Sequence, residues 1–210
     1  MYAGLGRTTA RSRYSISPRE MVMSFWRNRS LIWQMTRRDV IGRYRGSVMG
    51  IVWSFFHPIL MLGVYTFVFS VVFKTRWVGG DSTKAGFAIM LFVGLIIHGL
   101  FSECVSRAPV LVLNNVNYVK KVVFPLEILA WVGMASALFH ASVSTAVLVI
   151  FYAAVNASLH WTIVFFPLVL APFILLIMGL SWFLAATGVF LRDITQTMGI
   201  ITTVLLFLSP

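Results

Sequence analysis

The chain has 210 residues, of which 59% are hydrophobic and only 11% are charged, and its mean hydropathy is +0.89. Soluble domains carry about 25% charged residues, so this composition excludes an ordinary globular domain and indicates an integral membrane protein. The single cysteine, Cys104, excludes an intrachain disulfide, and the formal net charge is +11.

The apolar runs predict an all-α polytopic membrane protein. A bilayer core has no water to satisfy backbone groups, so spanning segments are helices or closed barrels. Barrel strands are about 10 residues long and alternate in polarity. The runs here are far longer and continuously apolar, which favours helices.

The N-terminal region carries most of the positive charge. Residues 1–16 are expected to form a disordered basic tail. Ser17, Pro18 and Glu20 form a capping box that predicts the start of a helix. Aromatic residues at helical spacing and frequent arginines then predict an amphipathic interfacial helix within residues 17–45. A helix packed in a soluble core is the alternative.

Five transmembrane helices are expected within residues 46–210. The first run has no charged residue over 28 positions, and a bilayer core of about 30 Å needs only about 20 apolar residues. Another run, between Glu127 and Arg192, is long enough for two spans. The expected spans are 46–73, 85–102, 128–153, 163–190 and 194–210. Because the last run reaches Pro210, a sixth span is expected beyond this sequence.

Basic residues predict the orientation. With the N-terminus inside, the inner segments hold 14 lysines and arginines and the outer segments hold three. Since cytoplasmic loops are enriched in basic residues, the N-terminus and residues 103–127 are expected in the cytoplasm. The basic region lies beside a span, so its expected partner is the membrane surface and not nucleic acid.

Four segments are similar, in order and spacing, to permease subunits of type-2 ABC exporters of bacterial polysaccharides. They are RDVIGRYRGSVMGIVWSFFHPILMLGVYTFVFSVVF, NNVNYVKKVVFPLEIL, FLRDI and LFLSP. The resemblance covers about residues 18–210. It implies an inner-membrane homodimer with six spans per subunit and two copies of a separate ATPase. The implied cargo is a lipid-linked polysaccharide of the O-antigen, capsule or teichoic acid type.

The chain has no P-loop motif, so ATP and Mg²⁺ are expected on the partner subunit and no cofactor on this one. The resemblance places a coupling segment, which contacts the ATPase, within residues 103–127, with Tyr118 and Phe124 as expected anchors. An ordinary connecting loop is the alternative. The candidate coupling residues are Asn115, Tyr118, Lys120, Lys121, Phe124 and Pro125.

Arginines at the start of the first span suit a lipid diphosphate, because guanidinium groups bind phosphate oxygens in pairs. Simple anchoring to anionic lipid is the alternative. The candidate head-group residues are Arg37, Arg38, Arg43, Tyr44 and Arg45.

Three aromatic residues, Tyr65, Phe69 and Phe73, recur every four positions and would lie on one helix face. Such rings can stack on sugars along a glycan pathway, or they can simply face lipid or other helices. Gly42, Gly46 and Gly50 have the spacing of a close helix contact, although such spacing is also common by chance in spans that contain glycine.

Neither a metal site nor a catalytic site is predicted. His57, His98 and His140 lie within spans without ligand spacing, so they are expected to make hydrogen bonds between helices. Glu103 and Arg107 are spaced to pair on one helix face. Two other functions stay open: an ABC permease for drugs or small lipids, and a membrane-embedded enzyme acting on lipid-linked sugars.

Overall fold

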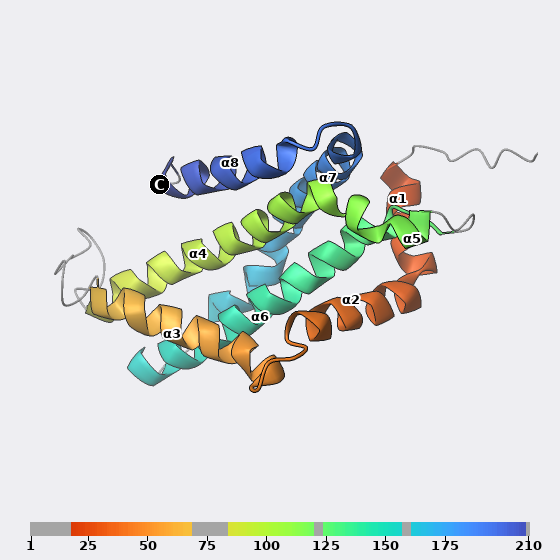
Figure 1. Ribbon diagram of the computed structural model, residues 1–210. Helices are drawn as coiled ribbons and strands as arrows, with labels where there is room; N and C mark the ends of the chain where they lie inside the picture. The colour runs from red at the N-terminus through yellow and green to blue at the C-terminus, as the bar shows by residue number, and fades with distance from the viewer. Residues whose placement is uncertain (1–17, 69–83, 120–123, 157–160, 209–210) are drawn as a thin grey trace, which may run out of the picture.

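The computed structural model describes residues 18–68, 84–119, 124–156 and 161–208, and all regular structure in these ranges is helical (Figure 1). The α-helices are α1 (Pro18–Arg27), α2 (Arg29–Arg43), α3 (Trp53–Phe67), α4 (Lys84–Arg107), α5 (Val116–Val119), α6 (Ile128–Asn156), α7 (Phe166–Phe190) and α8 (Ile194–Leu208). Short 3-10 turns are η1 (Gly50–Val52), η3 (Ala108–Val110), η4 (Leu113–Asn115) and η5 (Trp161–Phe165).

Within the described ranges, four helical stretches are long and apolar enough to cross a membrane, which confirms the all-α polytopic class. They are Gly50–Phe67, Gly86–Val110, Ile128–Val155 and Ile163–Phe190. The predicted fifth span corresponds to α8, a shorter apolar helix of 15 residues.

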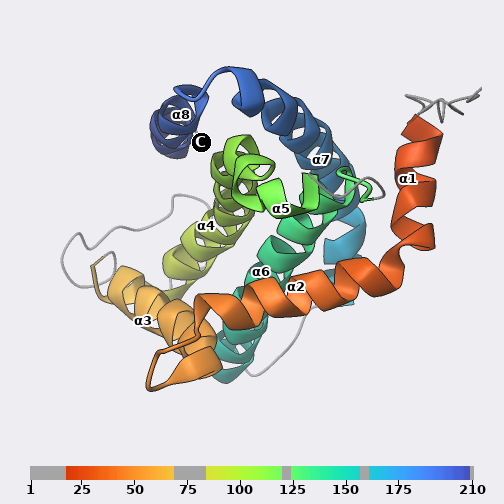
Figure 2. The same cartoon turned by 45° about the vertical axis from the view of Figure 1, so that its right-hand side comes forward.

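The helices α4 and α6 form the centre of the molecule. They lie side by side, α8 packs on the far side of α4, and α3 contacts both (Figure 1). Figure 2 shows α2 lying across α6, against which it packs. Buried residues of α4, α6 and α7, including Leu100, Met134 and Ile177, form the main apolar cluster.

The N-terminal amphipathic region is two helices, with Asn28 between α1 and α2. The α2 helix packs Ile32 and Met35 against α6, and Val40 of the same helix is also buried, while the indole rings of Trp26 and Trp33 are exposed. This region therefore packs on the helical core and also presents tryptophans outward. Its placement at a membrane surface stays a prediction.

The first spanning helix begins later than the sequence indicated. Gly46 and Gly50 have φ angles of 90° and 52°, in the left-handed region that glycine adopts without strain. They turn the chain between α2 and α3, and regular α-helix starts only at Trp53. The predicted helix contact through Gly42, Gly46 and Gly50 is therefore wrong, because two of these glycines are outside α-helices.

The second spanning helix, α4, ends later than predicted. Its helix was expected to stop before Glu103 but continues through Glu103 to Arg107. The continuation is possible because both charged side chains meet opposite charges from α2. Paired charges lose far less free energy on burial than isolated ones.

A close backbone contact holds α7 against the turn η3. Gly188 is buried in α7, and a Cβ atom placed there would overlap the carbonyl oxygen of Pro109. Leu184 of α7 packs with Val105 and Ala108 in the same place. Only glycine allows this approach of helix and turn.

Candidate functional site

Four charged side chains from α2 and α4 meet at one place, which we call the charge cluster: Asp39, Arg43, Glu103 and Arg107. The Arg107 guanidinium donates to both carboxylate oxygens of Asp39, at 2.9 Å to Oδ1 and 3.1 Å to Oδ2. Arg43 pairs with Glu103. Arg43 and Asp39 approach to 3.7 Å, and Arg107 and Glu103 to 3.6 Å. The cluster therefore ties α2 to α4.

A third helix joins the cluster through Ser136 of α6. Its hydroxyl donates to Oδ2 of Asp39 at 2.6 Å. Burial raises the pKa of Asp39, but hydrogen bonds from Arg107 and Ser136 outweigh this effect and hold the pKa below its ordinary value of 3.8. Asp39 is therefore ionised at neutral pH and joins α2, α4 and α6.

Tyr44 continues the contact between the N-terminal region and α6. Its hydroxyl oxygen lies 3.4 Å from Nδ1 of His140. Burial raises the pKa of Tyr44 above its ordinary value of 10.0 against the opposing effect of Arg43, and Glu103 adds to the rise. The phenol is thus protonated at neutral pH and is able to donate to the imidazole.

The candidate head-group residues lie in different surroundings. Arg43 and Tyr44 contact other residues of this chain, as described above, and the four arginines of the set are all exposed. The Arg38 guanidinium lies 5.6 Å from the centre of the Tyr118 ring, in the geometry of a cation–π contact. Lipid binding by this set stays a prediction.

The candidate coupling segment folds back on the protein. The rings of Tyr118 and Phe124 stack with centres 4.8 Å apart, and both pack on the cluster formed by Ile32 and Ile128 with their neighbours. Pro125 is half-buried, and the Asn115 amide donates to the Leu111 carbonyl at 2.8 Å. The two expected anchors thus have contacts within this chain, and their contact with an ATPase stays a prediction.

Residues other than Tyr118 and Phe124 form the exposed side of the candidate coupling segment. Asn114, Val116 and Asn117 are exposed. Lys120 and Lys121 lie outside the residues that the structure describes. The sequence alone could not show which residues of this segment face outward and which pack inward, because η4 and α5 are too short to show a helical period.

A cavity of about 400 Å³ lies between α3, α4 and α6, and we call it the polar cavity. Tyr65, the predicted glycan-pathway residue in the described part of the chain, lines it; Phe69 and Phe73 lie outside the described residues. The ionisable or hydroxyl-bearing lining residues are His57, Tyr65, Glu103, His140 and Ser144. Ionisable groups within membrane spans are candidate functional groups by default.

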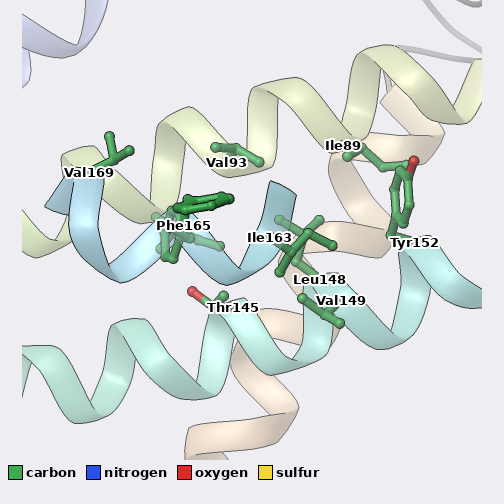
Figure 3. A pocket seen from close by; sticks show the side chains of 11 residues that line it. Ile89, Val93, Thr145, Leu148, Val149, Tyr152, Ile163, Phe165 and Val169 are labelled. Carbon is green, nitrogen blue, oxygen red and sulfur yellow. The ribbon is translucent and has the colours of Figure 1, made fainter. Parts of the chain in front are cut away.

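A second, apolar cavity of about 490 Å³ lies between α4, α6, η5 and α7. Figure 3 shows its lining, in which Ile89, Val93 and Phe165 belong to the apolar majority. Thr145 and Tyr152 are its hydroxyl-bearing lining residues. This cavity offers few polar groups to a ligand, in contrast to the polar cavity.

The predicted hydrogen bond between helices is confirmed for His98, whereas the partner of His140 lies just after the end of α2. His140 approaches Tyr44, as described, and the His98 Nε2 lies 2.9 Å from the carbonyl oxygen of Thr202. Thr202 is a buried residue of α8. His98 thus links α4 to α8, while His57 lines the polar cavity.

Replacing His98 with alanine should loosen α8 from α4, because the Thr202 carbonyl loses its donor. Such bonds in membrane proteins contribute about 0.6 kcal/mol on average, so we expect faster amide hydrogen exchange in α8 without unfolding. The matched control is Thr203→Val, which removes a hydroxyl bonded within α8 to the Gly199 carbonyl. Equal exchange in both variants would contradict a role for His98 in holding α8.

Sequence reasoning found part of the charge cluster. The pairing of Glu103 with Arg107 was predicted from their spacing, but Asp39, Arg43 and Ser136 were not assigned to it. One feature of the sequence could have pointed to Asp39 as a member of an ion pair: it is one of two acidic residues in a segment with ten arginines. Among the described residues, no three His, Cys, Asp or Glu side chains converge in a way that could hold a metal ion.

Comparison with known proteins places this chain in a family. Residues 30–210 match the family described as ABC-2 type transporter. The chain is similar to the O-antigen export system permease protein RfbA of Myxococcus xanthus, with 26% identity over 190 residues, or 90% of this chain and 70% of the relative. It is 23% identical to RfbA of Klebsiella pneumoniae over 178 residues, or 84% of this chain and 66% of the relative.

The chain therefore spans about two thirds of the length of these curated relatives. The family match covers the charge cluster, the polar cavity and all spanning helices. Four helices among the described residues are long and apolar enough to cross a membrane, and this protein is therefore a multi-pass membrane protein of the ABC-2 type transporter family.

Proposed function

We propose that this chain is the permease subunit of an ATP-driven exporter that moves a lipid-linked polysaccharide out of the bacterial cytoplasm. The observation that carries the proposal is the family match over residues 30–210 together with relatives named as O-antigen export permeases. Two copies of the permease form the pathway, and the cargo is a glycan of the O-antigen, capsule or teichoic acid type.

The energy comes from a separate ATPase subunit. A P-loop motif is absent from the 210 residues, and a family of ABC transporter membrane proteins has ATPases as natural partners. The ATPase binds ATP and Mg²⁺, and this chain converts its movement into a shift of the spanning helices.

The ATPase contacts the segment between α4 and α6. Asn114, Val116 and Asn117 are exposed there, while Tyr118 and Phe124 support the segment from inside by packing towards α2 and α6. The Arg38–Tyr118 contact links the same segment to α2. A push on the segment therefore reaches α2 and α6 directly.

The protein lies in the inner membrane with its N-terminus in the cytoplasm. The distribution of basic residues supports this orientation, because 14 of the 17 lie in segments that are then internal. The exposed rings of Trp26 and Trp33 support a position of α1 and α2 at the membrane surface, where tryptophan is enriched.

The test is ATP-driven transport in inverted membrane vesicles that contain the full-length permease and its ATPase. A radiolabelled lipid-linked glycan is added outside, and its arrival in the lumen is measured with ATP and without it. We expect the labelled glycan to accumulate in the lumen only when ATP is present. The matched control carries the same permease with an ATPase whose P-loop lysine is replaced by alanine, and it should show none.

Two outcomes would overturn the proposal. ATP-driven movement of a small lipid or a dye without movement of the glycan would assign the chain to the drug and small-lipid exporters. Failure of any ATPase to co-purify with the permease, combined with chemical change of the lipid-linked sugar, would favour the membrane-embedded enzyme.

A further inference from the structure

Two apolar cavities follow one another along α4, α6 and α7. The first is the apolar cavity of about 490 Å³ described above, and the second has a volume of about 570 Å³. They adjoin, because they share four lining residues that come from all three helices: Ile96, Thr145, Val149 and Phe166. We call the two cavities together the apolar crevice.

The crevice lies where α6 and α7 move apart. Near the start of α6 the two helices pack closely: the rings of Trp131 and Trp182 are 5.7 Å apart, and the Trp182 indole donates to the Glu127 carbonyl at 3.3 Å. Towards the end of α6, lining residues such as Val149 face the crevice, and residues of η5 and α7 line another side of it (Figure 3). Packing between the two helices therefore leaves this part unfilled.

The lining gives a polar ligand little to bind. The Thr145 hydroxyl already donates to the Ala141 carbonyl at 2.8 Å. The Ser142 hydroxyl donates to the Leu138 carbonyl at 2.7 Å. Tyr152, the third hydroxyl-bearing residue in the described lining, stands about one turn before the end of α6. Apolar cavities of about 150 Å³ stay dry and take up apolar molecules, so this larger space suits an apolar occupant.

The size of the crevice favours a lipid tail over a helix of another protein or of a second copy. An α-helix with its side chains is about 10–12 Å across, so a length of about 20 Å occupies roughly 1,600 Å³ or more. That volume exceeds the two cavities together. A hydrocarbon chain is only one methylene group thick, and it bends to follow an irregular space.

The crevice is open to the lipid around the protein. Ile150 and Val169, which line it, are each 70% exposed, so a tail can enter from the side. Along α6 the lining runs from Leu138 to Tyr152, roughly 21 Å at about 1.5 Å per residue. One leaflet contributes half of a bilayer core of about 30 Å. The crevice is therefore long enough for the tail of one phospholipid.

We propose that the apolar crevice between α4, α6, η5 and α7 binds one acyl chain of a bilayer phospholipid. The chain fills the space that the helices leave open and so supports the end of α6 against the start of α7. This inference goes beyond the proposed function. It concerns a lipid of the surrounding membrane and requires only that these helices span the bilayer.

The test is photolabelling of the full-length permease and its ATPase in phospholipid nanodiscs. The probe is a phosphatidylglycerol with a diazirine halfway along one acyl chain, and a matched probe carries the diazirine on the head group. Mass spectrometry identifies the labelled residues. Thr145 and Phe166 report the crevice, since both line its two cavities. Leu176 of α7 is 59% exposed and outside both linings, so it reports lipid that merely surrounds the protein.

We expect the mid-chain probe to label Thr145 and Phe166 more strongly than Leu176, although both are only half-buried or less exposed than Leu176. The head-group probe should not label them. After transfer of the protein from nanodiscs to detergent, surrounding lipid is diluted away, so labelling at Leu176 should be lost. Labelling at Thr145 and Phe166 should persist, because the bound chain stays in its site.

A variant that fills the crevice tests the site directly. Val149→Trp places an indole ring where the two cavities adjoin, and it should remove most of the labelling at Thr145 and Phe166. The matched control is Leu175→Trp, which adds the same ring on the exposed face of α7, outside both linings. It should leave labelling of the crevice unchanged.

Several results would overturn the proposal. Stronger labelling at Leu176 than in the crevice would mean that protein side chains close this space, and full labelling of a folded Val149→Trp variant would refute the site. Loss of labelling on addition of a little polyprenyl phosphate would assign the crevice to a lipid carrier instead. If Val149→Trp does not fold, the native protein decides: equal loss of all labelling in detergent would refute the proposal.

The outcome is separable from that of the transport assay. Glycan transport by a protein whose crevice stays unlabelled would refute the lipid site and leave the exporter function standing. A labelled crevice in a protein that moves no glycan would refute the exporter function and leave the lipid site.

Discussion

Replacing Gly188 with alanine should sharply lower the yield and the thermal stability of the folded protein. The added methyl group would overlap the Pro109 carbonyl oxygen and lie 2.6 Å from the Pro109 Cα, and these backbone atoms cannot rotate away. Overpacking typically costs about 1–3 kcal/mol, and a clash with backbone belongs at the upper end. The measurement is the unfolding temperature of the purified protein in detergent.

The matched control is Gly179→Ala on the same helix. A Cβ atom at Gly179 meets nothing within 4 Å, and alanine favours helix over glycine by about 1 kcal/mol. This variant should be as stable as the native protein or slightly more stable. If Gly188→Ala behaves like Gly179→Ala, then α7 does not approach η3 as closely as described.

Replacing Arg107 with methionine should weaken the link between α2 and α4, leaving the Arg43–Glu103 pair, and destabilise the protein by about 1–3 kcal/mol. Asp39 would lose its hydrogen bonds to the guanidinium and would keep Ser136 and a longer contact with Arg43. The estimate lies between about 0–1 kcal/mol for exposed pairs and about 3–5 kcal/mol for breaking buried ones. It is intermediate because the two side chains are 35% and 28% exposed, so solvent screens them in part.

A double-mutant cycle with Asp39→Asn separates the pair from its surroundings. Once Asp39 is neutral, Arg107→Met should cost much less than it does in the native protein. Arg29→Met is the control, since it removes an exposed arginine at the start of α2 and should change little. Additive effects of the two cluster substitutions would contradict the pairing.

The same pair predicts a response to acid. The pKa of Asp39 in the folded protein is lower than the 3.8 expected in the unfolded chain. The ionised Asp39 carboxylate therefore contributes its full stabilisation above pH 3.8, and this stabilisation is lost as the pH falls through the folded-state pKa. The Asp39→Asn protein should lack this part of the acid-induced loss.

Hydrophobic runs were enough to predict the spanning helices, because a long apolar segment has few alternatives to a helix in a bilayer. The helix ends were harder to place. The stop expected at Glu103 was wrong because a partner on α2, distant in sequence, lets α4 continue to Arg107. The helix break at Asn28 and the turn at Gly46 were not predicted, because the amphipathic pattern of residues 17–45 continues through the first and up to the second.

The site residues show the same limit. Contacts at helical spacing, such as Glu103 with Arg107, could be predicted because helix geometry alone brings them together. The contact of Asp39 with Arg107 and Ser136 depends on how three helices pack, which no local pattern encodes. For the same reason, Tyr118 was expected to face a partner, yet it packs within this chain.

The charge cluster has a consequence for the response of the protein to membrane voltage. Each helix contributes one charge of each sign, Asp39 and Arg43 from α2 and Glu103 and Arg107 from α4. Moving one elementary charge through the full electric field is worth about 2.3 kcal/mol per 100 mV. The charges that each helix brings to the cluster sum to zero, so in a uniform field no net electrical work is done on these groups when either helix translates without rotating.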